Sequence, residues 1–212
     1  MQLLLATHNQ NKLKEFNKIF VNTNIEILSL KSFTKNEPIE NGKSFEANAL
    51  IKARHASKLT SFSYPTIADD SGLCIDNLNG APGIFSARWA YKNDYNCAFD
   101  KIKNHLNKKG LNMNEQLAKF VCVLALIDKK KNEFIFKGIL QGKIVFPPRG
   151  KNGFGYDPIF APLNFNKTLA QASSSLKNSL SHRKKALVKL LKHDLFKDYF
   201  SQDNFINQKT DR

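Results

Sequence analysis

The chain has 212 residues, of which 42% are hydrophobic, and it carries a formal net charge of +15 at pH 7. This length and apolar content allow one compact domain with a sizeable core. The longest apolar run, Phe120 to Ile127, is far shorter than the roughly 18 residues of a membrane-spanning helix, which excludes a helical membrane protein. The wide spacing of Cys74, Cys97 and Cys122 excludes a disulfide framework and a C-x-x-C zinc site, so we expect reduced, structural thiols.

The start of the chain predicts a strand followed by a helix. Leu3 to Ala6 has the composition of a short buried strand, and the polar loop Thr7 to Asn11 leads from it into a helix. The apolar start is too short and lacks the positive charge of a signal peptide, so we expect a cytoplasmic protein. The helix places four apolar side chains on one face, namely Leu13, Phe16, Ile19 and Phe20.

The rest of the chain predicts a mixed α/β protein. Ile25 to Leu30 reads as a second strand, and the polar stretch Pro38 to Gly42 leads into a helix that contains Phe45, Ala49, Lys52, Ala53 and Ala56. The acidic stretch Asp69 to Gly72 separates two predicted strands, Thr66 to Ala68 and Leu73 to Ile75. The remaining predicted elements are a loop at Gly80 to Gly83, a helix from Asp94 to Leu106, a hairpin of Lys119 to Ile127 with Glu133 to Leu140, a short strand from Lys143 to Phe146 and a helix near Ser179 to Leu191. We expect one domain over residues 1–212, with two lobes and a tail that frays from about residue 201.

The loop between the first strand and the first helix is a candidate phosphate site. It contains Thr7, His8, Asn9, Gln10, Asn11 and Lys12. Free backbone N–H groups and the positive end of a helix dipole favour an anion at such a place. The loop is not a P-loop, because G-x-x-x-x-G-K-[ST] is absent. The alternative is an ordinary capping loop, since Thr and Asn cap helices well.

Acidic side chains suggest a metal site. Asp69 and Asp70 stand together at a predicted strand end, and such carboxylates suit Mg²⁺, which keeps most of its waters and bridges to phosphates. One of the two carboxylates would alternatively polarise an attacking water. Glu40 is a candidate third carboxylate. An Asp-rich turn that ends in Gly72 is the structural alternative.

Two further segments carry binding chemistry. The stretch from Gly150 to Pro158 combines glycines with Phe154 and Tyr156, whose rings offer faces on which a base would stack. A surface loop without function is the alternative. Near the last helix, cations and donors for a phosphate or a base carbonyl come from Lys177, Ser181, His182 and Arg183.

Taken in order, the motifs resemble those of the inosine/xanthosine triphosphate pyrophosphatase family. The resemblance runs from about residue 2 to about residue 192 and rests on Thr7-x-Asn9-x-x-Lys12, Glu40-x-Gly42, Phe45-x-x-Asn48-Ala49, Ala68 to Leu73, Gly80 to Gly83, Phe154 to Pro158 and Ser181-His182-Arg183. It implies a long mixed sheet flanked by helices, two lobes with the active site in the cleft, and a homodimer. It also implies hydrolysis of ITP, dITP and XTP to the monophosphate and pyrophosphate, with Mg²⁺ as cofactor.

By the same resemblance, Thr7 to Lys12 bind the phosphates, Glu40 and Asp70 bind the metal, and Asp70 matches the proton acceptor. The substrate-binding positions are Ser71, Phe154, Gly155, Tyr156, Asp157, Lys177, His182 and Arg183, with Phe154 stacked on the purine. Ala47 departs from the pattern, since many relatives have Glu there, and Gln171 to Leu176 is Ser-rich where relatives are acidic. Water would attack the α-phosphorus in line. Whether Asp70 activates that water or only holds the metal stays open.

The positive charge leaves a second class of function to consider. Phe154, Tyr156 and the cluster Arg183-Lys184-Lys185 would also suit a module that binds single-stranded RNA. That hypothesis leaves the acidic pair unexplained, and the lysines are scattered along the whole chain, so we expect no nucleic-acid partner. A closer alternative is a pyrophosphatase for other altered nucleotides.

Overall fold

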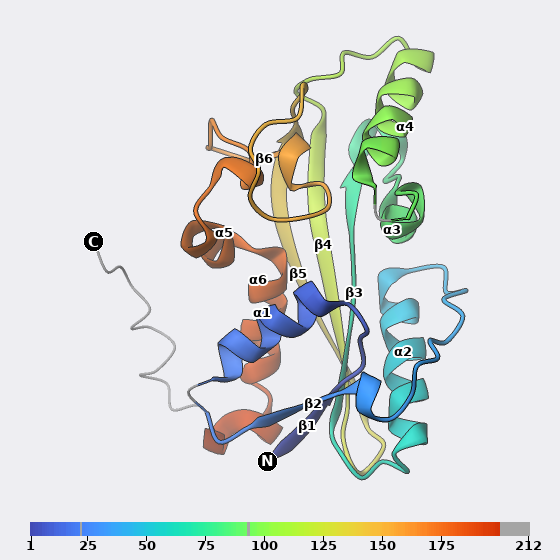
Figure 1. Cartoon of the computed structure of the whole chain (residues 1–212), viewed down its shortest axis with the longest axis vertical. Coiled ribbons are helices and arrows are strands. Elements are labelled where there is room, and N and C mark those ends of the chain that lie inside the picture. The colour runs from blue at the N-terminus through green and yellow to red at the C-terminus, as the bar shows by residue number, and fades with distance from the viewer. Residues whose placement is uncertain (22, 93, 200–212) are drawn as a thin grey trace. The chain divides into compact units, whose positions relative to one another are not determined.

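The computed structural model describes residues 1–21, 23–92 and 94–199, so the tail predicted to fray from about residue 201 lies outside the described residues. One six-stranded sheet has the order β2-β1-β3-β4-β5-β6 (Figure 1). Its strands are β1 Gln2–Leu5, β2 Glu26–Ser29, β3 Thr66–Ile75, β4 Leu117–Ile127, β5 Glu133–Ile144 and β6 Phe160–Pro162. The helices are α1 Gln10–Phe20, α2 Phe45–Leu59, α3 Ser86–Trp89, α4 Tyr95–Lys108, α5 Ser174–Leu180 and α6 His182–Leu191.

The sheet is mixed, as predicted. β1 pairs in parallel with both β2 and β3, whereas β5 and β6 are antiparallel. β4 and β5 are neighbours joined by the short connection Asp128 to Asn132, which only an antiparallel hairpin permits. The mixed α/β class and the predicted hairpin are therefore confirmed. Among the described residues, no helix combines the length and the apolar character that crossing a membrane requires.

The chain divides into two compact units. Unit 1 consists of Met1–Asp69, Val123–Phe136 and the chain from Leu187, and unit 2 consists of Asp70–Cys122 and Lys137–Ala186. β3, β4 and β5 each contribute residues to both units. That residues 1–212 act as one domain stays a prediction.

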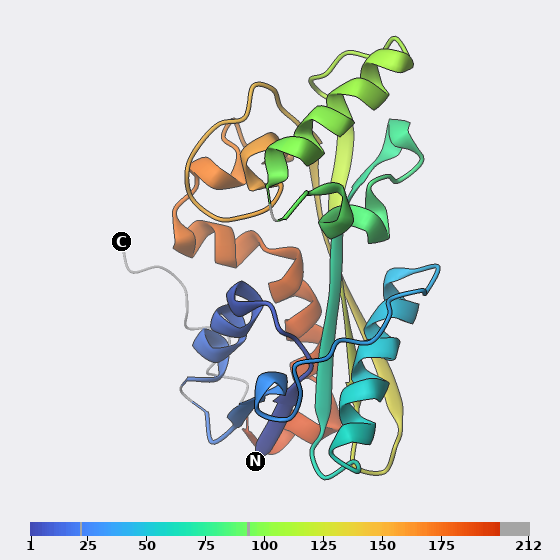
Figure 2. The ribbon, with the colours of Figure 1, turned by 45° about the vertical axis from the view of Figure 1, so that its right-hand side comes forward.

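In unit 1, the first three strands follow a doubly wound pattern. β1 is central, with β2 on one side and β3 on the other, and α1 and α2 form the two crossovers. The crossover from β1 to β2 and the crossover from β2 to β3 run in opposite directions along the sheet, so right-handed connections place α1 and α2 on opposite faces. Figures 1 and 2 show α1 and α2 on opposite sides of these strands. The carboxyl end of β1 is therefore a topological switch point, where ligands bind in open α/β sheets.

Small and apolar side chains hold these layers together. Leu3, Leu4 and Leu5 of β1 are buried, and so are Phe16 and Phe20 on the inner face of α1, as the helical spacing predicted. On α2 the face against the strands is made of small residues, namely Ala49, Ala53 and Ala56, which are fully buried. Their small size lets the backbone of α2 pack closely on the sheet.

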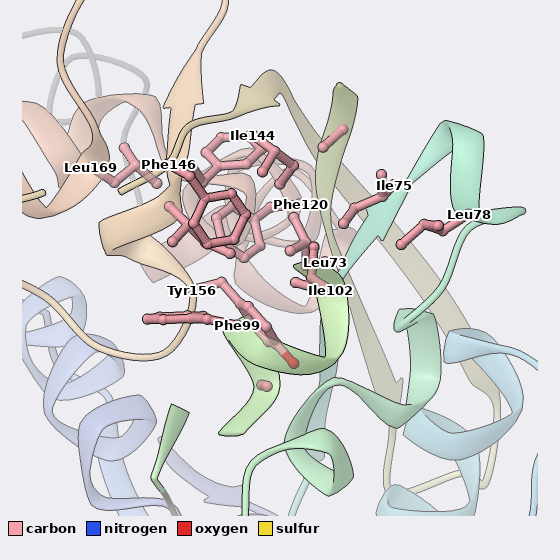
Figure 3. Packing of buried hydrophobic residues seen from close by; sticks show 14 of the residues in the cluster. Leu73, Ile75, Leu78, Phe99, Ile102, Phe120, Ile144, Phe146, Tyr156 and Leu169 are labelled. Atoms are coloured by element: carbon pink, nitrogen blue, oxygen red, sulfur yellow. The ribbon is translucent and has the colours of Figure 1, made fainter. Parts of the chain in front are cut away.

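In unit 2, one aromatic-rich cluster forms the core (Figure 3). Tyr156 packs edge-on against Tyr95, with the ring centroids 5.2 Å apart, and Phe99 lies 6.1 Å from the ring of Tyr156. The Tyr156 hydroxyl donates a hydrogen bond to the Ser86 carbonyl at 2.8 Å, which satisfies its polar end. Burial raises the pKa of the Tyr156 phenol, and burial followed by the charge of Asp157 raises the pKa of Tyr95, so both hydroxyls stay protonated at neutral pH.

Three sequence predictions about elements were wrong. β3 is one continuous strand, so Asp69 and Asp70 lie in its middle and not at a strand end. β5 continues through Gly142, so no separate strand begins at Lys143; a side chain at Gly142 would collide with Phe160 and Ala161 of β6, which explains the glycine. The last predicted helix starts at His182, where Ser181 caps it, and the preceding α5 was missed.

Candidate active site

The loop after β1 is held by its own polar side chains. Asn9 is the N-cap of α1, and its side-chain oxygen accepts from the backbone N–H groups of Asn11 at 3.0 Å and Lys12 at 3.2 Å. The Asn9 N–H in turn donates to the Thr7 hydroxyl at 3.1 Å. The capping role weighed as an alternative is therefore present. It also rigidifies the loop, and α1 has no acidic residue in its first turn to oppose an anion.

Lys12 is directed from α1 toward β3. Its ammonium forms an ion pair with the Asp69 carboxylate and lies 3.3 Å from the Asp69 carbonyl oxygen. The Asp69 side chain is 0% exposed, and a buried carboxylate needs such a cation. Lys12 is thus held in place at the switch point, and its ammonium partly neutralises the Asp69 carboxylate.

We expect Lys12→Ala to destabilise unit 1 and also to weaken binding of a triphosphate. Leaving the Asp69 carboxylate buried without its cation costs about 3–5 kcal/mol. The double variant Lys12→Ala/Asp69→Asn should recover most of the melting temperature, because no buried charge is left. Its KM for ITP should stay raised by at least about tenfold, the effect of one lost hydrogen bond to a charged group.

A double variant with a wild-type KM would contradict this role. Lys12 would then serve only to neutralise Asp69.

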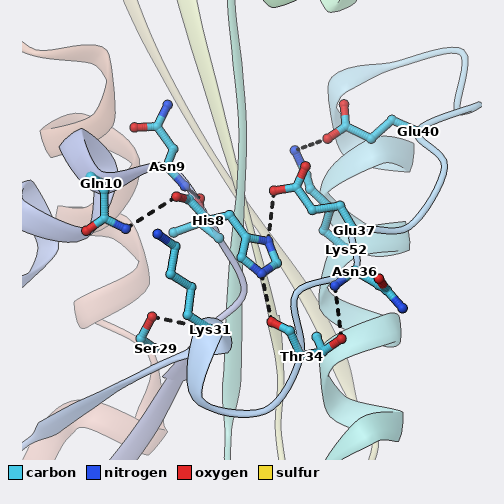
Figure 4. A network of polar contacts seen from close by, with 11 residues as sticks. His8, Asn9, Gln10, Ser29, Lys31, Thr34, Asn36, Glu37, Glu40 and Lys52 are labelled. Atoms are coloured by element: carbon cyan, nitrogen blue, oxygen red, sulfur yellow. Dashed lines mark hydrogen bonds and ion pairs between the residues drawn. The ribbon is translucent and has the colours of Figure 1, made fainter.

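His8 ties this loop to the segment that follows β2 (Figure 4). Its Nδ1 lies 2.9 Å from a carboxylate oxygen of Glu37, and its Nε2 lies 3.0 Å from the Thr34 carbonyl oxygen. Both partners offer acceptor oxygens, so an N–H on either ring nitrogen has a partner. The His8 imidazole is therefore engaged within the protein, and substrate binding by His8 stays a prediction.

Glu40, the predicted metal ligand, lies in the same segment beside α2. Its carboxylate is 3.1 Å from the ammonium of Lys52 and remains 32% exposed, whereas the Lys52 side chain is 14% exposed (Figure 4). The ion pair holds the carboxylate in place. Glu40 can therefore offer an oxygen ligand to a hard cation.

Asp70 stands apart from Asp69 although the two are adjacent in the chain. Successive side chains of a strand point to opposite faces, so the two carboxylates do not form one ligand pair. The Asp69 carboxylate forms an ion pair with Lys12. Asp70, which is 7% exposed, is therefore the metal candidate of the two. In the described parts of the chain, no group of three or more His, Cys, Asp or Glu side chains could hold a metal ion. Mg²⁺ needs no such protein cage, because it keeps several waters and takes one or two carboxylates together with substrate phosphates.

In unit 2, Phe154, Asp157 and Lys177 form one compact group. The Asp157 carboxylate accepts the Phe154 backbone N–H at 2.8 Å and pairs with the Lys177 ammonium at 2.6 Å. The same ammonium lies 4.5 Å from the centroid of the Phe154 ring, over its face. Gly153 has a φ of +80°, and a side chain there would collide with Asp157, so this glycine is required.

The other predicted residues of unit 2 lie on β3 and α6. Arg183 in the first turn of α6 is 4% exposed, and its guanidinium lies 3.5 Å from the Ser71 hydroxyl. The His182 ring stacks on Phe120, with the centroids 4.9 Å apart and the planes 13° from parallel. The Tyr156 ring belongs to the buried core cluster, whereas Phe154 does not, so Phe154 is the stacking candidate of this loop.

The model of the Ham1 family matches residues 3–193 of the chain. The chain belongs to the Ham1 family. A dITP/XTP pyrophosphatase of Zymomonas mobilis is 40% identical over 191 residues, which cover 90% of this chain and 90% of that protein. The solved HAM1 protein of Coxiella burnetii matches with a TM-score of 0.81 at 39% identity, covering 90% of this chain and 96% of the other. The Ham1 protein of Staphylococcus aureus matches with a TM-score of 0.77 at 36% identity over 90% and 96% of the two chains.

Membership of the Ham1 family confirms the resemblance drawn from the motifs. The structure adds two residues that the sequence analysis did not assign a site role, Asn48 and Lys52, which both contact the Glu40 to Gly42 segment. A cue was present in the sequence. Lys52 interrupts the apolar and small residues of the helix, and Asn48 is one helical turn before it.

Proposed function

We propose that the protein hydrolyses non-standard purine nucleoside triphosphates such as ITP, dITP and XTP. Water and the triphosphate give the monophosphate and pyrophosphate, which removes these nucleotides from the pool. The proposal is carried by the 40% identity to a dITP/XTP pyrophosphatase across nine tenths of both chains.

Unit 1 would bind the triphosphate. Thr7 to Lys12 lie at the N-terminus of α1 and at the switch point, where backbone N–H groups and the helix dipole attract anions. Lys12 and Lys52 add two ammonium groups, each already fixed by a carboxylate. Fixed cations lose less entropy on binding a phosphate than free ones do.

Mg²⁺ would be held by the carboxylates of Glu40 and Asp70. The donor set fits this ion, because it consists of carboxylate oxygens and includes no thiolate or imidazole. Bound Mg²⁺ would neutralise charge on the triphosphate and on the departing pyrophosphate.

Asp70 would supply the negative charge that orients the attacking water or accepts its proton. The water oxygen bonds to the α-phosphorus in line with the leaving group, the α–β anhydride bond breaks, and the electron pair leaves with pyrophosphate. The water proton passes to Asp70 or to solvent. Both versions of the step require an ionised carboxylate at position 70.

Unit 2 would recognise the purine. The Phe154 ring, with the Lys177 ammonium over one face, would stack on the base. The candidate donors for a 6-carbonyl oxygen are the side chains of Lys177, His182 and Arg183 together with backbone N–H groups. The position of Ser71 beside Arg183 supports a contact to the same substrate.

A direct test is to identify the product released from ITP. We expect pyrophosphate and IMP, with activity lost on chelation by EDTA and restored by added Mg²⁺. Release of inorganic phosphate with IDP would contradict cleavage at the α-phosphorus, and full activity in EDTA would contradict the metal assignment. The homodimer and the cytoplasmic location stay predictions, and light scattering of the purified protein measures the first.

The alternative as an RNA-binding module draws little support from unit 2. Tyr156 is 3% exposed and lies in the core, so it does not offer the open stacking surface that single-strand binders use. If this alternative holds, RNA binding should weaken steeply with salt and ITP should remain intact.

A further inference from the structure

Asn48 is a buried polar residue near the start of α2 with no part in the chemistry described so far. Its side chain is 0% exposed. Asn is a poor choice for a buried helix position unless its carboxamide is used at both ends, as acceptor and as donor. The two ends are used very differently here.

The oxygen end fixes the segment that carries Glu40. Asn48 Oδ1 accepts the backbone N–H of Gly42 at 2.9 Å. A side chain at Gly42 would collide with this oxygen and with the Cβ of Ala47, so only glycine permits the approach. The backbone two residues after Glu40 is therefore held directly against α2.

The nitrogen end has no acceptor. Within the described part of the chain, Asn48 Nδ2 is buried and makes no hydrogen bond. The Gly42 N–H needs an acceptor, so the orientation of the carboxamide is determined and Nδ2 is the end left over. A buried donor without an acceptor destabilises the fold, so stability alone would favour an apolar residue at this position.

Asn48 shares its helix face with Lys52. The two residues are four apart, which places them one above the other on α2. Both reach the same segment, Asn48 at Gly42 and Lys52 at Glu40. The unused donor thus belongs to a group that already contains a carboxylate and an ammonium, and an anionic oxygen beside Lys52 would give it an acceptor.

We propose that Asn48 takes part in ligand binding in unit 1. Oδ1 positions Glu40 through Gly42, and Nδ2 donates a hydrogen bond to a phosphate oxygen bound beside Lys52. The inference rests on the proposed function, because it takes the ligand to be a phosphate-bearing nucleotide. It assigns to the motif Phe45-x-x-Asn48-Ala49 a chemical role besides packing.

Two nearly isosteric variants separate the two ends. Asn48→Asp keeps an acceptor for the Gly42 N–H but removes the donor and adds a charge, whereas Asn48→Leu removes the donor without adding a charge. In both variants the KM for ITP and the Kd for Mg²⁺-pyrophosphate should rise at least about tenfold, as for a lost hydrogen bond to a charged group. Asn48→Leu removes both ends, so it should also raise the Mg²⁺ concentration that gives half of the maximal rate. The melting temperature of Asn48→Leu should stay within a few degrees of wild type, because the unsatisfied donor is gone as well.

Ser57→Ala is the matched control. Ser57 is a second fully buried residue of α2 whose hydroxyl has no partner in the described chain, and it lies nine residues, or about 13 Å, further along the helix. Its removal should leave KM, the Kd for pyrophosphate and the Mg²⁺ dependence unchanged.

Unchanged KM and pyrophosphate binding in both Asn48 variants would overturn the proposal, as would a loss of stability with normal binding, which indicates a purely structural role. Failure of the proposed function is a separate result, seen as wild-type protein that leaves ITP intact. The binding of Mg²⁺-pyrophosphate, measured calorimetrically, still tests Asn48 in that case.

Discussion

Asp70→Asn is expected to lower kcat for ITP by on the order of 100-fold or more while the protein stays folded. The substitution keeps the shape of the side chain and removes its charge. Both roles considered for Asp70, metal ligand and proton acceptor, depend on that charge. Asp70 is 7% exposed in the middle of β3, so the neutral amide adds no desolvation cost to the strand. Pyrophosphate release and thermal unfolding, measured on the same preparation, test both parts of the expectation.

Two other aspartates serve as controls for this variant. Asp69→Asn changes the adjacent residue, whose side chain pairs with Lys12, so it should affect melting temperature and KM more than kcat. Asp100→Asn removes an exposed carboxylate whose surface ion pair with Lys103 contributes little, so it should behave as wild type. Near-normal turnover by Asp70→Asn would refute the assignment of Asp70 to the chemical step.

Local pattern was sufficient to predict most elements of the fold. The apolar face of α1 and the hairpin of β4 and β5 follow from side-chain periodicity and turn residues, which depend on sequence neighbours alone. Periodicity failed at β3, because Asp and Gly disfavour strands and imitate a turn there. The strand continues through Asp69 because Lys12, far away in the sequence, neutralises the buried carboxylate. A tertiary contact thus outweighed a local preference.

At the candidate site, too, the residues could be predicted from the sequence but their contacts could not. The motifs identify which residues to consider, since loop position and residue chemistry are readable from the sequence. The partners of those residues are not readable, because they come from other elements: Thr34 and Glu37 for His8, and Lys177 for Phe154. For this reason the role proposed for Asn48 could not be predicted from the sequence, since its burial and its contact with Gly42 form only when α2 packs.

ITP and XTP are expected to exceed ATP in kcat/KM by roughly two to four orders of magnitude. Phosphate contacts cannot tell these nucleotides apart, so the discrimination must come from the base. Hypoxanthine and xanthine present a 6-carbonyl acceptor, whereas adenine presents an amino donor at the same position. The candidate groups in unit 2, Lys177, His182 and Arg183, offer donors. Each buried donor left facing another donor costs about 1–3 kcal/mol, and sites built to bond a substrate group can discriminate by roughly 10⁴-fold.

A panel of triphosphates separates this hydrogen-bond mechanism from simple size exclusion. Purine riboside triphosphate has only hydrogen at position 6, so it is smaller than ITP and accepts no bond there. If hydrogen-bond donors in the base site cause the discrimination, the kcat/KM for this nucleotide should be far below that for ITP, in the range of ATP. If the size of the group at position 6 causes it, the kcat/KM should match that for ITP. GTP shares the 6-carbonyl, so its rejection would come from crowding or unpaired donors at the 2-amino group and should leave it between ITP and ATP. Comparable kcat/KM values for ATP and ITP would contradict a role in clearing the nucleotide pool, even for an active pyrophosphatase, because such an enzyme would consume the ATP that a cell holds in large excess.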